Sequence, residues 1–545
     1  MSAEYKRVLY ISHAEVGGAA LSLIGMLDCL KNYITPIVII PRKGDFEKLL
    51  IQYNIKYLIV PFTYAYAKIG NYTQMDSDRV YIDNVCAAYK IARIVEEQHI
   101  QMIHSNSSII DVGAIAAVIA NVPHLWHLRE FCEEDFGMEF INQEWKKLLF
   151  DTSNFFSISQ SIKNSYYKKY LLKSDMAINF VDARLITQNH LIFTNKIVTI
   201  IIAGEISPGK GQLDAIRAIN ILVKKNIFKI RLIVVGNGTQ NYVWILKKYI
   251  EYNNLNDYIK ICQFHSDLDE IRKNCDISLT CSKMEGLGRV TLEAMIAGIV
   301  VIGADTGGTK ELIGDNQERG YLYVQGDFRD LASKLELAIE DKLQRNIKRE
   351  NALNYTREIT NSKLYAEKIL STYEQCVSIF CEKSSFREKV MTYMDTNTVK
   401  GDGSIEIMGN DMTIAMGNKF QEMFILAEKW LCIHNEGKTI GNYMRTYGYQ
   451  TIAIYGIGYL GQRVYDELLR EGIGITYIVD KIFDDVIDMD DWIPLLNPNN
   501  NLPQVDLIII TTVMEADDIK AMLTARYLYS IVNLSDIIDG MLMEH

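Results

Sequence analysis

Short apolar runs rich in β-branched residues alternate with longer stretches of helical periodicity over the first 375 residues. The first runs fall at residues 8–11, 37–40, 57–60 and 102–104, and each precedes an amphipathic stretch. Buried parallel strands read as continuous apolar runs and are joined by helical crossovers, so this rhythm is typical of parallel βαβ units. It predicts a doubly wound, Rossmann-like α/β domain over residues 1–190.

The same rhythm restarts after Asn195. Apolar runs at residues 197–203, 230–235, 259–261, 277–280 and 300–302 predict a second doubly wound domain over residues 191–375. Ligands of such sheets bind beside the carboxyl ends of the strands. We therefore expect a ligand between the two sheets.

The rhythm breaks at residues 376–440, for which we predict a linker and a helix. The segment 395–418 is rich in Gly, Asp, Asn and Met, and residues 420–434 have the pattern of an amphipathic helix. A third, small Rossmann-like domain is predicted over residues 441–545, with strands at 451–455, 475–479 and 507–511. The predicted fold class is therefore α/β throughout.

The most informative stretch, residues 282–295, reads SKMEGLGRVTLEAM. It follows a predicted strand, opens a helix, and places Glu285 and Glu293 on either side of a glycine loop. Carboxylates accept paired hydrogen bonds from hydroxyls, so this spacing suits two polyols such as a sugar and a ribose. Gly286 and Gly288 permit close backbone approach, and the helix N-terminus favours a phosphate. The alternative interpretation is a helix N-terminus with ordinary surface glutamates.

Two further glycine-rich junctions favour an anionic ligand at the same sheet edge. Lys210 lies in a glycine-flanked turn between the first strand of the second domain and a helix, where an ammonium can neutralise a diphosphate. Residues 305–313 (DTGGTKELI) form another strand–glycine–helix junction. A single lysine in such a turn is usually solvated, but three junctions on one edge are difficult to explain without an anion.

Together these motifs resemble a retaining glycosyltransferase of the GT-B fold, glycosyltransferase family 4. The resemblance spans roughly residues 5–375. The motifs that match the family are Glu285 with Glu293, Lys210 with Gly211, the turn at 234–238, and Gly17 with Gly18 before the first helix.

The resemblance implies a role for each motif. Glu293 would hold the donor ribose, and Glu285 the hydroxyls of the transferred sugar. Lys210 would bind the leaving diphosphate. The family's active-site histidine corresponds to His127, in the polar cluster that ends the strand at residues 123–130. The family also implies that a helix near residues 364–375 crosses back to the first domain.

The family further implies that several glycine-loop residues contact the donor, with the Gly17-Gly18 loop closing over the diphosphate. These expected donor contacts are Gly17, Gly18, Gly204, Gly211, Gly286, Leu287, Gly288, Arg289 and Glu293. One position departs from the family pattern, because Glu205 stands where many relatives have a phosphate-binding Arg. Arg289 is the candidate replacement for that missing charge.

Composition and charge limit the classes of partner and the cellular location that we expect. The formal net charge of -11 argues against a nucleic-acid partner. Every uncharged apolar stretch is far shorter than the about twenty residues that a membrane span needs. The nine cysteines contain no CxxC pair, and the N-terminus has no apolar signal-peptide core, so we expect a cytoplasmic protein. Lys146, Lys147 and the basic–aromatic segment 163–173 indicate either peripheral contact with the inner membrane face or ordinary solvated helices.

No metal or other cofactor is expected to be required for transfer. We find no acidic pair placed to hold a metal between phosphates, and the acidic run Asp488, Asp490 and Asp491 lies in the third domain. The protein would then stabilise the leaving group with cations and backbone N–H groups alone.

The third domain carries its own glycine motif. Gly456, Gly458 and Gly461 follow a strand and open a helix, and Asp480 ends the next strand, as in a dinucleotide fingerprint. Three interpretations stay open: a module that binds NAD, another nucleotide or a nucleotide sugar; a scaffold or homo-oligomerisation unit; and an active redox domain.

The sequence therefore predicts a retaining hexosyltransferase (EC 2.4) that uses a UDP- or GDP-type nucleotide sugar. Its acceptor would be a glycan, a lipid-linked sugar or a protein, in bacterial surface polysaccharide synthesis. A sugar phosphorylase or a nucleotide-sugar 2-epimerase is the nearest enzymatic alternative. The alternative from another class is a non-catalytic nucleotide- or NAD-sensing scaffold with a degenerate GT-B core.

Overall fold

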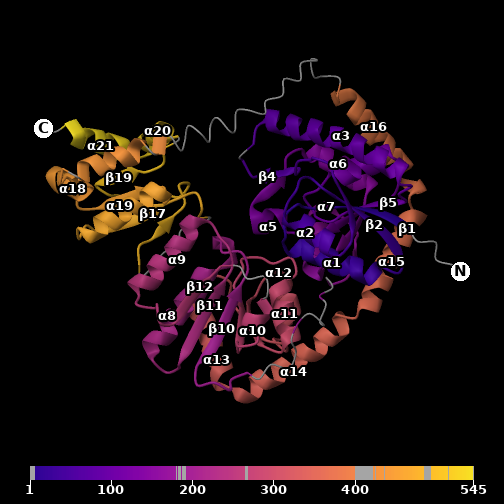
Figure 1. Ribbon diagram of the computed structural model, residues 1–545, viewed down its shortest axis with the longest axis horizontal. Coiled ribbons are helices and arrows are strands. Elements are labelled where there is room, and N and C mark those ends of the chain that lie inside the picture. The colour runs from indigo at the N-terminus through magenta and orange to yellow at the C-terminus, as the bar shows by residue number, and fades with distance from the viewer. Residues whose placement is uncertain are drawn as a thin grey trace. The chain divides into compact units, whose positions relative to one another are not determined.

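The computed structural model describes residues 6–70, 72–178, 181, 186, 192–263, 268–398, 422–423, 425–434, 436–483, 492–513 and 515–543. Three parallel sheets with helical crossovers make up this part of the chain (Figure 1), which confirms the predicted α/β class. The acidic run at Asp488, Asp490 and Asp491 lies outside the described residues, as does the predicted linker from residue 399 onward.

The first sheet has seven parallel strands in the order β3-β2-β1-β5-β6-β8-β9. Its strands are β1 (Lys6–Ile11), β2 (Ile34–Ile40), β3 (Lys56–Ile59), β5 (Met102–Ser105), β6 (His124–Leu128), β8 (Asn154–Ser157) and β9 (Asp175–Met176). The helices between them are α1 (Gly18–Leu30), α2 (Asp45–Gln52), α3 (Gln74–Glu97), α4 (Val112–Ile119), α5 (Cys132–Phe136), α6 (Gln143–Thr152) and α7 (Gln160–Tyr170). A small antiparallel ribbon pairs β4 (Tyr66–Lys68) with β7 (Met138–Phe140).

Both faces of this sheet are buried. Along β1, Val8 and Tyr10 join one apolar cluster with α1 and α2, whereas Leu9 and Ile11 join another with α3 and α4. Successive side chains of a strand point to opposite faces. A strand covered on both sides therefore reads as an uninterrupted apolar run, which is why these strands were predictable.

The helix α15 (Ser362–Ser378) returns to the first sheet, as the family resemblance implies. Tyr365, Ala366, Ile369, Tyr373 and Cys376 pack in the same cluster as β1 and α1, and Figure 1 shows α15 beside α1. The chain then continues through η3 (Cys381–Lys383) into α16 (Ser384–Thr398), which packs on α4 and α6. Residues 376–398 are thus part of the first layer of helices and do not form a linker.

The second sheet has six parallel strands in the order β12-β11-β10-β13-β14-β15. Its strands are β10 (Val198–Ala203), β11 (Ile230–Val235), β12 (Ile259–Cys262), β13 (Ile277–Thr280), β14 (Val300–Ala304) and β15 (Tyr321–Tyr323). Its helices are α8 (Gln212–Lys225), α10 (Leu268–Arg272), α11 (Arg289–Ala297), α12 (Gly307–Ile313), α13 (Phe328–Glu340) and α14 (Lys342–Ile359). Within the described ranges, no helix combines the length and apolar character that a membrane span needs.

Packing divides the chain into two units. One contains both of these sheets, in the described residues of Met1–Glu205, Gly209–Asn237 and Asn256–Gly403. The other contains the third sheet, together with Ile206–Pro208 and Gly238–Leu255.

The helix α9 (Gln240–Tyr252) therefore packs with the third sheet's unit. The Trp244 ring lies 5.0 Å from the Tyr465 ring, and Lys248 pairs with Asp466 at 2.8 Å.

The third sheet has five parallel strands in the order β18-β17-β16-β19-β20. They are β16 (Ile452–Tyr455), β17 (Ile475–Val479), β18 (Leu495–Leu496), β19 (Leu507–Ile510) and β20 (Ser530–Asn533), with helices α18 (Ile440–Tyr447), α19 (Tyr459–Arg470), α20 (Ala516–Arg526) and α21 (Leu534–Met543). Strand order reverses between β16 and β19, the position at which such sheets bind ligands.

One buried carboxylate joins three segments of this unit. Glu467 on α19 is 4% exposed, and it accepts hydrogen bonds from Trp430 Nε1 at 3.0 Å, His434 Nε2 at 2.7 Å and the Ile440 backbone N–H at 2.6 Å. Residues 425–434 are helical, so the carboxylate connects this helix, the first turn of α18 and α19.

Replacing Glu467 with Ala should therefore destabilise this unit by about 2–4 kcal/mol, because three donors lose their common acceptor. Hydrogen-exchange mass spectrometry should show faster exchange in peptides covering residues 425–470, with peptides of the first two sheets unchanged. Asp518→Asn, at an exposed position on α20, is the control. Equal exchange in the two variants would contradict the role assigned to Glu467.

Candidate active site

The loop between β13 and α11 carries the first predicted carboxylate. Lys210 Nζ donates to Glu285 Oε1 at 3.0 Å, and Ser282 Oγ donates to the same oxygen at 2.6 Å. Gly288 caps α11 with φ = 83°, in the left-handed region that favours glycine. The structure thus brings Lys210 and Glu285, 75 residues apart, into direct contact.

Lys210 is held as an ammonium at this site. Burial alone would lower the pKa of Lys210, but Glu285 and Asp135 together raise it. The side chain is still 23% exposed, so an anionic ligand can reach it. A cation with this degree of access is suited to a phosphate.

Glu293, in the first turns of α11, lies between two guanidinium groups. Arg289 Nε donates to Glu293 Oε1 at 2.8 Å, and Arg272 Nη2 donates to Oε2 at 2.7 Å. Arg289 Nη1 also donates to Ser22 Oγ of α1 at 3.3 Å. Arg289 is therefore shared between Glu293 and Ser22 of α1. Its replacement of the missing phosphate-binding Arg stays a prediction that rests on its position beside the site.

Glycines allow the loops of the site to pack backbone against backbone. A Cβ at Gly286 would lie 2.3 Å from the Arg129 carbonyl oxygen, and one at Gly211 would lie 2.2 Å from the Cys281 carbonyl oxygen. Gly308 packs on Leu287 in the same way, and its N–H donates to the Glu285 carbonyl at 2.8 Å.

Three of the other predicted glycines have open space beside them. A Cβ at Gly17, Gly18 or Gly204 would meet no atom within 4 Å, and Gly17 is the extended residue that precedes α1. Packing therefore does not demand glycine at Gly17 or Gly18, whereas Gly204 has φ = 137°. Open backbone at Gly17-Gly18 suits close approach by a ligand.

Contacts between the loops of the two sheets adjoin this site. Ser159 Oγ, at the start of α7, donates to the Gly286 carbonyl at 2.6 Å. The Glu311 carboxylate on α12 accepts the backbone N–H groups of Gln160 and Ser161, each at 3.0 Å. A carboxylate at a helix N-terminus is favoured by the helix dipole.

The predicted catalytic histidine lies deeper than expected. His127 is fully buried in β6, with its Nδ1 3.2 Å from Arg129 Nη2 and 3.1 Å from His104 Nε2. Burial holds the pKa of His127 well below its usual range, and the Arg129 charge lowers it further. Arg129, two residues further along, is also buried, and Glu130 is partly exposed. The catalytic role of His127 stays a prediction.

Sequence reasoning missed three residues of the site. Arg129 was included only within the polar cluster at residues 123–130, and Arg272 and Asp135 were not noted at all. Burial raises the pKa of Asp135 to about 6, while Lys210 opposes that shift. The only sequence signal for Asp135 was the acidic stretch at residues 133–135 after a strand end.

The third sheet brings its predicted residues together as well. Asp480 accepts the backbone N–H of Ile457, inside the glycine loop, at 2.7 Å. A Cβ at Gly461 would lie 2.0 Å from the Gly456 carbonyl oxygen, whereas one at Gly458 would face open space. The geometry is that of a glycine loop at the switch point of the sheet.

Two other features bear on ligands and partners. Among the residues that the structure describes, no group of three or more His, Cys, Asp or Glu is placed to hold a metal ion.

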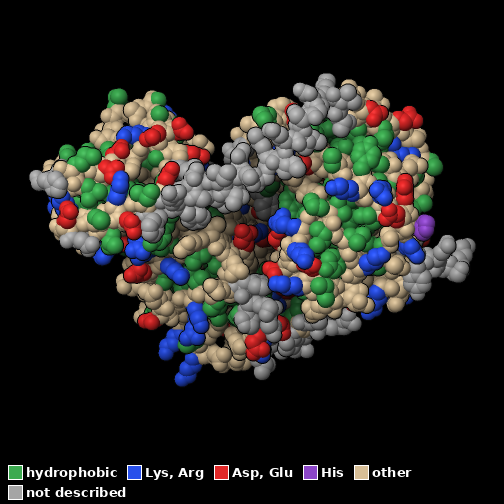
Figure 2. All heavy atoms as spheres, turned by 45° about the horizontal axis from the view of Figure 1, so that its top comes forward, with side chains coloured by type: hydrophobic (Ala, Val, Ile, Leu, Met, Phe, Trp, Pro, Cys, Tyr) green, Lys and Arg blue, Asp and Glu red, His purple; other side chains and the backbone are tan. Residues whose placement is uncertain are grey.

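Lys146, expected on a basic surface, is buried, with its ammonium 4.0 Å from the centre of the Tyr170 ring. Its assignment to a surface patch is wrong, and the face drawn in Figure 2 mixes Lys and Arg with Asp and Glu.

Two doubly wound parallel sheets with a returning helix define the GT-B fold. Among solved structures, HepE of Anabaena in complex with UDP and glucose is similar over 68% of this chain and 100% of that chain, with a TM-score of 0.57 and 21% identity. At that identity the similarity establishes the fold.

The family comparison matches the part of the chain that contains the second sheet. Residues 184–358 match the family described as "Glycosyl transferases group 1". N-acetyl-alpha-D-glucosaminyl L-malate synthase of Bacillus anthracis is 30% identical over 145 residues, which are 26% of this chain and 36% of that protein. The capsular polysaccharide biosynthesis glycosyltransferase CapM of Staphylococcus aureus is 24% identical over 243 residues, 42% of this chain and 63% of CapM. The chain thus spans about a third to two thirds of these relatives.

Gly286→Ala should destabilise the site loop by about 1–3 kcal/mol, because a Cβ there overlaps the Arg129 carbonyl and the backbone must shift. Thermal unfolding and hydrogen exchange of peptides covering residues 280–290 measure the effect. Gly209→Ala, where a Cβ would meet no atom within 4 Å, is the matched control. A Gly286→Ala loop as protected as that of the control would contradict the tight packing.

Asp135 should give the unfolding temperature a specific pH dependence. Its pKa is raised in the folded chain from 3.8 to about 6. The folded state therefore binds this proton more tightly, and the resulting stability is lost as pH rises from 4 to 6. Relative to Asp135→Asn, the wild type should lose stability over this interval and then level off. A difference that is constant from pH 4 to pH 7 would contradict the shift.

Proposed function

We propose that this protein is a retaining glycosyltransferase that moves a hexose from a nucleoside-diphosphate sugar to a glycan acceptor. The observation that carries the proposal is the convergence of Lys210, Glu285 and Glu293 at the carboxyl edge of the second sheet. All three lie inside the segment that matches the glycosyltransferase family.

The proposed reaction breaks the bond between the anomeric carbon and the diphosphate oxygen. Negative charge then grows on the diphosphate, and the Lys210 ammonium and the N-terminus of α11 are placed to stabilise it. The donor phosphate would displace Glu285 from Lys210, since both anions need the same cation. Glu285 is then free to accept hydrogen bonds from the sugar hydroxyls.

Glu293 is proposed to hold the ribose. Arg272 and Arg289 each occupy one side of its carboxylate, and each oxygen keeps a further acceptor site for a hydroxyl. Because the Arg272 side chain is only 4% exposed, it fixes the carboxylate orientation before a donor arrives.

Retention of the configuration at the anomeric carbon is implied by the family resemblance and agrees with the proposed chemistry. The acceptor oxygen would attack the face that the diphosphate leaves, so the new bond to the anomeric carbon forms where the old bond broke. The acceptor proton passes to the departing diphosphate oxygen. Contacts such as Ser159 to Gly286 would exclude water and limit donor hydrolysis.

The proposed donor is UDP-hexose, supported by the solved neighbour that carries UDP and glucose. The proposed pathway is surface polysaccharide synthesis, supported by the name of CapM. If the acceptor is lipid-linked, the exposed Tyr167 and Leu171 at the end of α7, beside Lys168 and Lys173, are the side chains proposed to touch the membrane.

For the third domain we propose nucleotide binding at the Gly456–Gly461 loop, with Asp480 beside it. A thermal-shift series with UDP, GDP and NAD(H) tests it, on wild type and on Gly458→Val. A shift with any of these that Gly458→Val abolishes supports the proposal. Shifts unaffected by this variant leave the domain as a scaffold.

Lys210→Ala should lower glycosyl transfer by about 100-fold or more, because the leaving diphosphate loses its ammonium partner. Release of UDP or GDP from UDP-glucose, UDP-N-acetylglucosamine and GDP-mannose measures turnover. Lys283→Ala removes an exposed lysine from the neighbouring loop between β13 and α11 and should stay near wild-type activity. Equal activity of the two variants would contradict the assignment of Lys210, and a wild type inactive with the whole panel would favour the non-catalytic scaffold.

A further inference from the structure

A continuous chain of buried hydrogen bonds runs from the returning helix to the edge of the site. Tyr10 Oη on β1 is 2.7 Å from Tyr373 Oη on α15, and Tyr373 Oη is 2.8 Å from His104 Nδ1 on β5. His104 Nε2 is 3.1 Å from His127 Nδ1 on β6. These four side chains are fully buried.

The far end of the chain is fixed by a group that can only donate. Arg129 Nη2 lies 3.2 Å from His127 Nδ1, and Arg129 Nε donates to Asn106 Oδ1 at 3.0 Å. A guanidinium has no acceptor, so His127 Nδ1 must be the unprotonated nitrogen. A neutral His127 then carries its proton on Nε2.

This constraint sets every other proton in the chain. His127 Nδ1 has a lone pair, so His104 Nε2 must donate to it, and His104 Nδ1 must accept from the Tyr373 hydroxyl. Tyr373 in turn accepts from Tyr10. Which nitrogen of a histidine carries the proton is set by the hydrogen bond made at the other nitrogen.

One donor in this arrangement is left over. His127 Nε2 is buried and has no hydrogen-bond partner among the described residues. Buried N–H groups are rarely left without an acceptor, so this one marks a place where something other than the chain supplies the oxygen.

We propose that Tyr373 is a positioning residue for the transfer proposed above: it holds His104 as the Nε2–H tautomer, which together with Arg129 keeps the His127 ring oriented as the Nε2–H tautomer, available to an oxygen of the bound sugar. This inference rests on the proposed function. The returning helix α15 then does more than pack on the first sheet. Its Tyr373 hydroxyl donates to His104 Nδ1 and so prevents the His104 proton from moving from Nε2 to Nδ1. Without the hydroxyl, His104 gains nothing from keeping Nδ1 unprotonated, and the hydrogen bond to His127 is no longer enforced.

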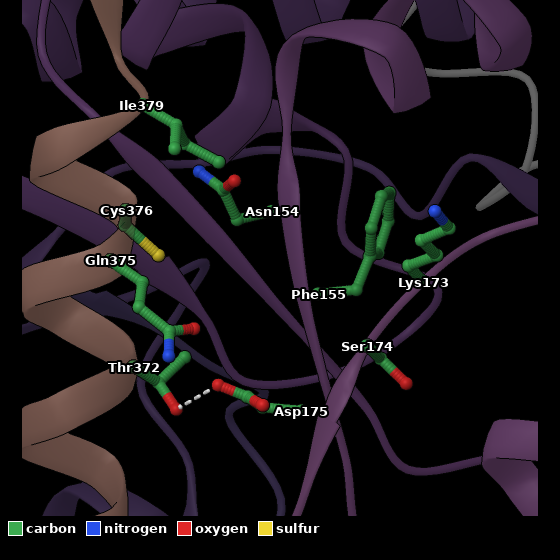
Figure 3. A pocket seen from close by; sticks show the side chains of 9 residues that line it. All are labelled: Asn154, Phe155, Lys173, Ser174, Asp175, Thr372, Gln375, Cys376 and Ile379. Atoms are coloured by element: carbon green, nitrogen blue, oxygen red, sulfur yellow. Dashed lines mark hydrogen bonds between the residues drawn. The ribbon is translucent and has the colours of Figure 1, made fainter.

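Tyr373→Phe tests this with little change in volume. The matched control is Thr372→Val on the same helix, which removes the 2.8 Å hydrogen bond from Thr372 Oγ1 to Asp175 Oδ2. Thr372 and Asp175 line a separate cavity of about 220 Å³ beside the first residues of β8 and β9 (Figure 3). Tyr373→Phe removes two hydrogen bonds between α15 and the first sheet, and Thr372→Val removes one. A purely structural role predicts lower stability in both variants, with the histidine tautomers unchanged in both.

The first measurement is the histidine tautomer, which needs no turnover. Long-range proton–nitrogen NMR spectra of the full chain, labelled with nitrogen-15 in its nine histidines, distinguish Nδ1–H from Nε2–H forms. Loss of one signal set in His104→Gln and in His127→Gln assigns the two rings. We expect both rings to be Nε2–H in the wild type and in Thr372→Val, and the His104 signals to change form or broaden in Tyr373→Phe.

The second measurement is turnover with the nucleotide sugar that the wild type uses best in the panel above. We expect kcat to fall about tenfold in Tyr373→Phe with KM for the donor within about twofold, and Thr372→Val to stay near wild type. An Nδ1–H form of either ring in the wild type would overturn the inference. So would unchanged tautomers in Tyr373→Phe, or equal losses of kcat in the two variants. If the wild type turns over no donor, the proposed function fails, and the tautomer spectra still decide whether Tyr373 sets the protonation of His104.

Discussion

Close contact between backbones, possible only at glycine, is the constraint on which the site depends. Gly286 packs on the Arg129 carbonyl and Gly211 on the Cys281 carbonyl, each nearer than any side chain would permit. These contacts bring the loops after β6, β10 and β13 to one place. Lys210 can therefore contact Glu285, although 75 positions separate the two residues in the sequence. Side chains at Gly211 and Gly286 would push these loops apart and separate Lys210 from Glu285, while the strands of the sheets could stay in place.

The charges of the site are arranged in overlapping pairs. Glu285 is shared by Lys210 and Ser282, and Glu293 by Arg272 and Arg289. In the absence of a ligand each carboxylate thus has cationic partners, which limits the cost of partly burying it. In the donor complex proposed above, a diphosphate would compete for Lys210, whereas a ribose would join Glu293 without displacing either arginine. The two carboxylates are therefore similar in sequence context but differ in what a donor must rearrange.

The sequence predicted the sheets better than the site. Strands such as β11 and β13 were predicted to the residue, because strands buried on both faces leave uninterrupted apolar runs. Short edge strands such as β9 and β18, with two residues each, leave no such signal. Within the site, residues adjacent in sequence were found together, as in the Glu285 loop. Arg272 and Asp135 reach it only through tertiary packing, which no local pattern encodes. The depth of His127 could not be predicted, because one polar cluster spans the end of β6 and a sequence does not show which of its residues the neighbouring helices cover.

The return of α15 has a consequence for how the chain is made. Tyr10 and Tyr373, whose hydroxyls are hydrogen-bonded, are 363 positions apart. The part of the first sheet that α15 covers thus stays exposed until the second sheet and α15 have been synthesised. Pairings this distant in sequence form late and expose apolar surface meanwhile. The amino-terminal half consequently lacks part of its apolar core until α15 packs on it, although its strand pattern is complete.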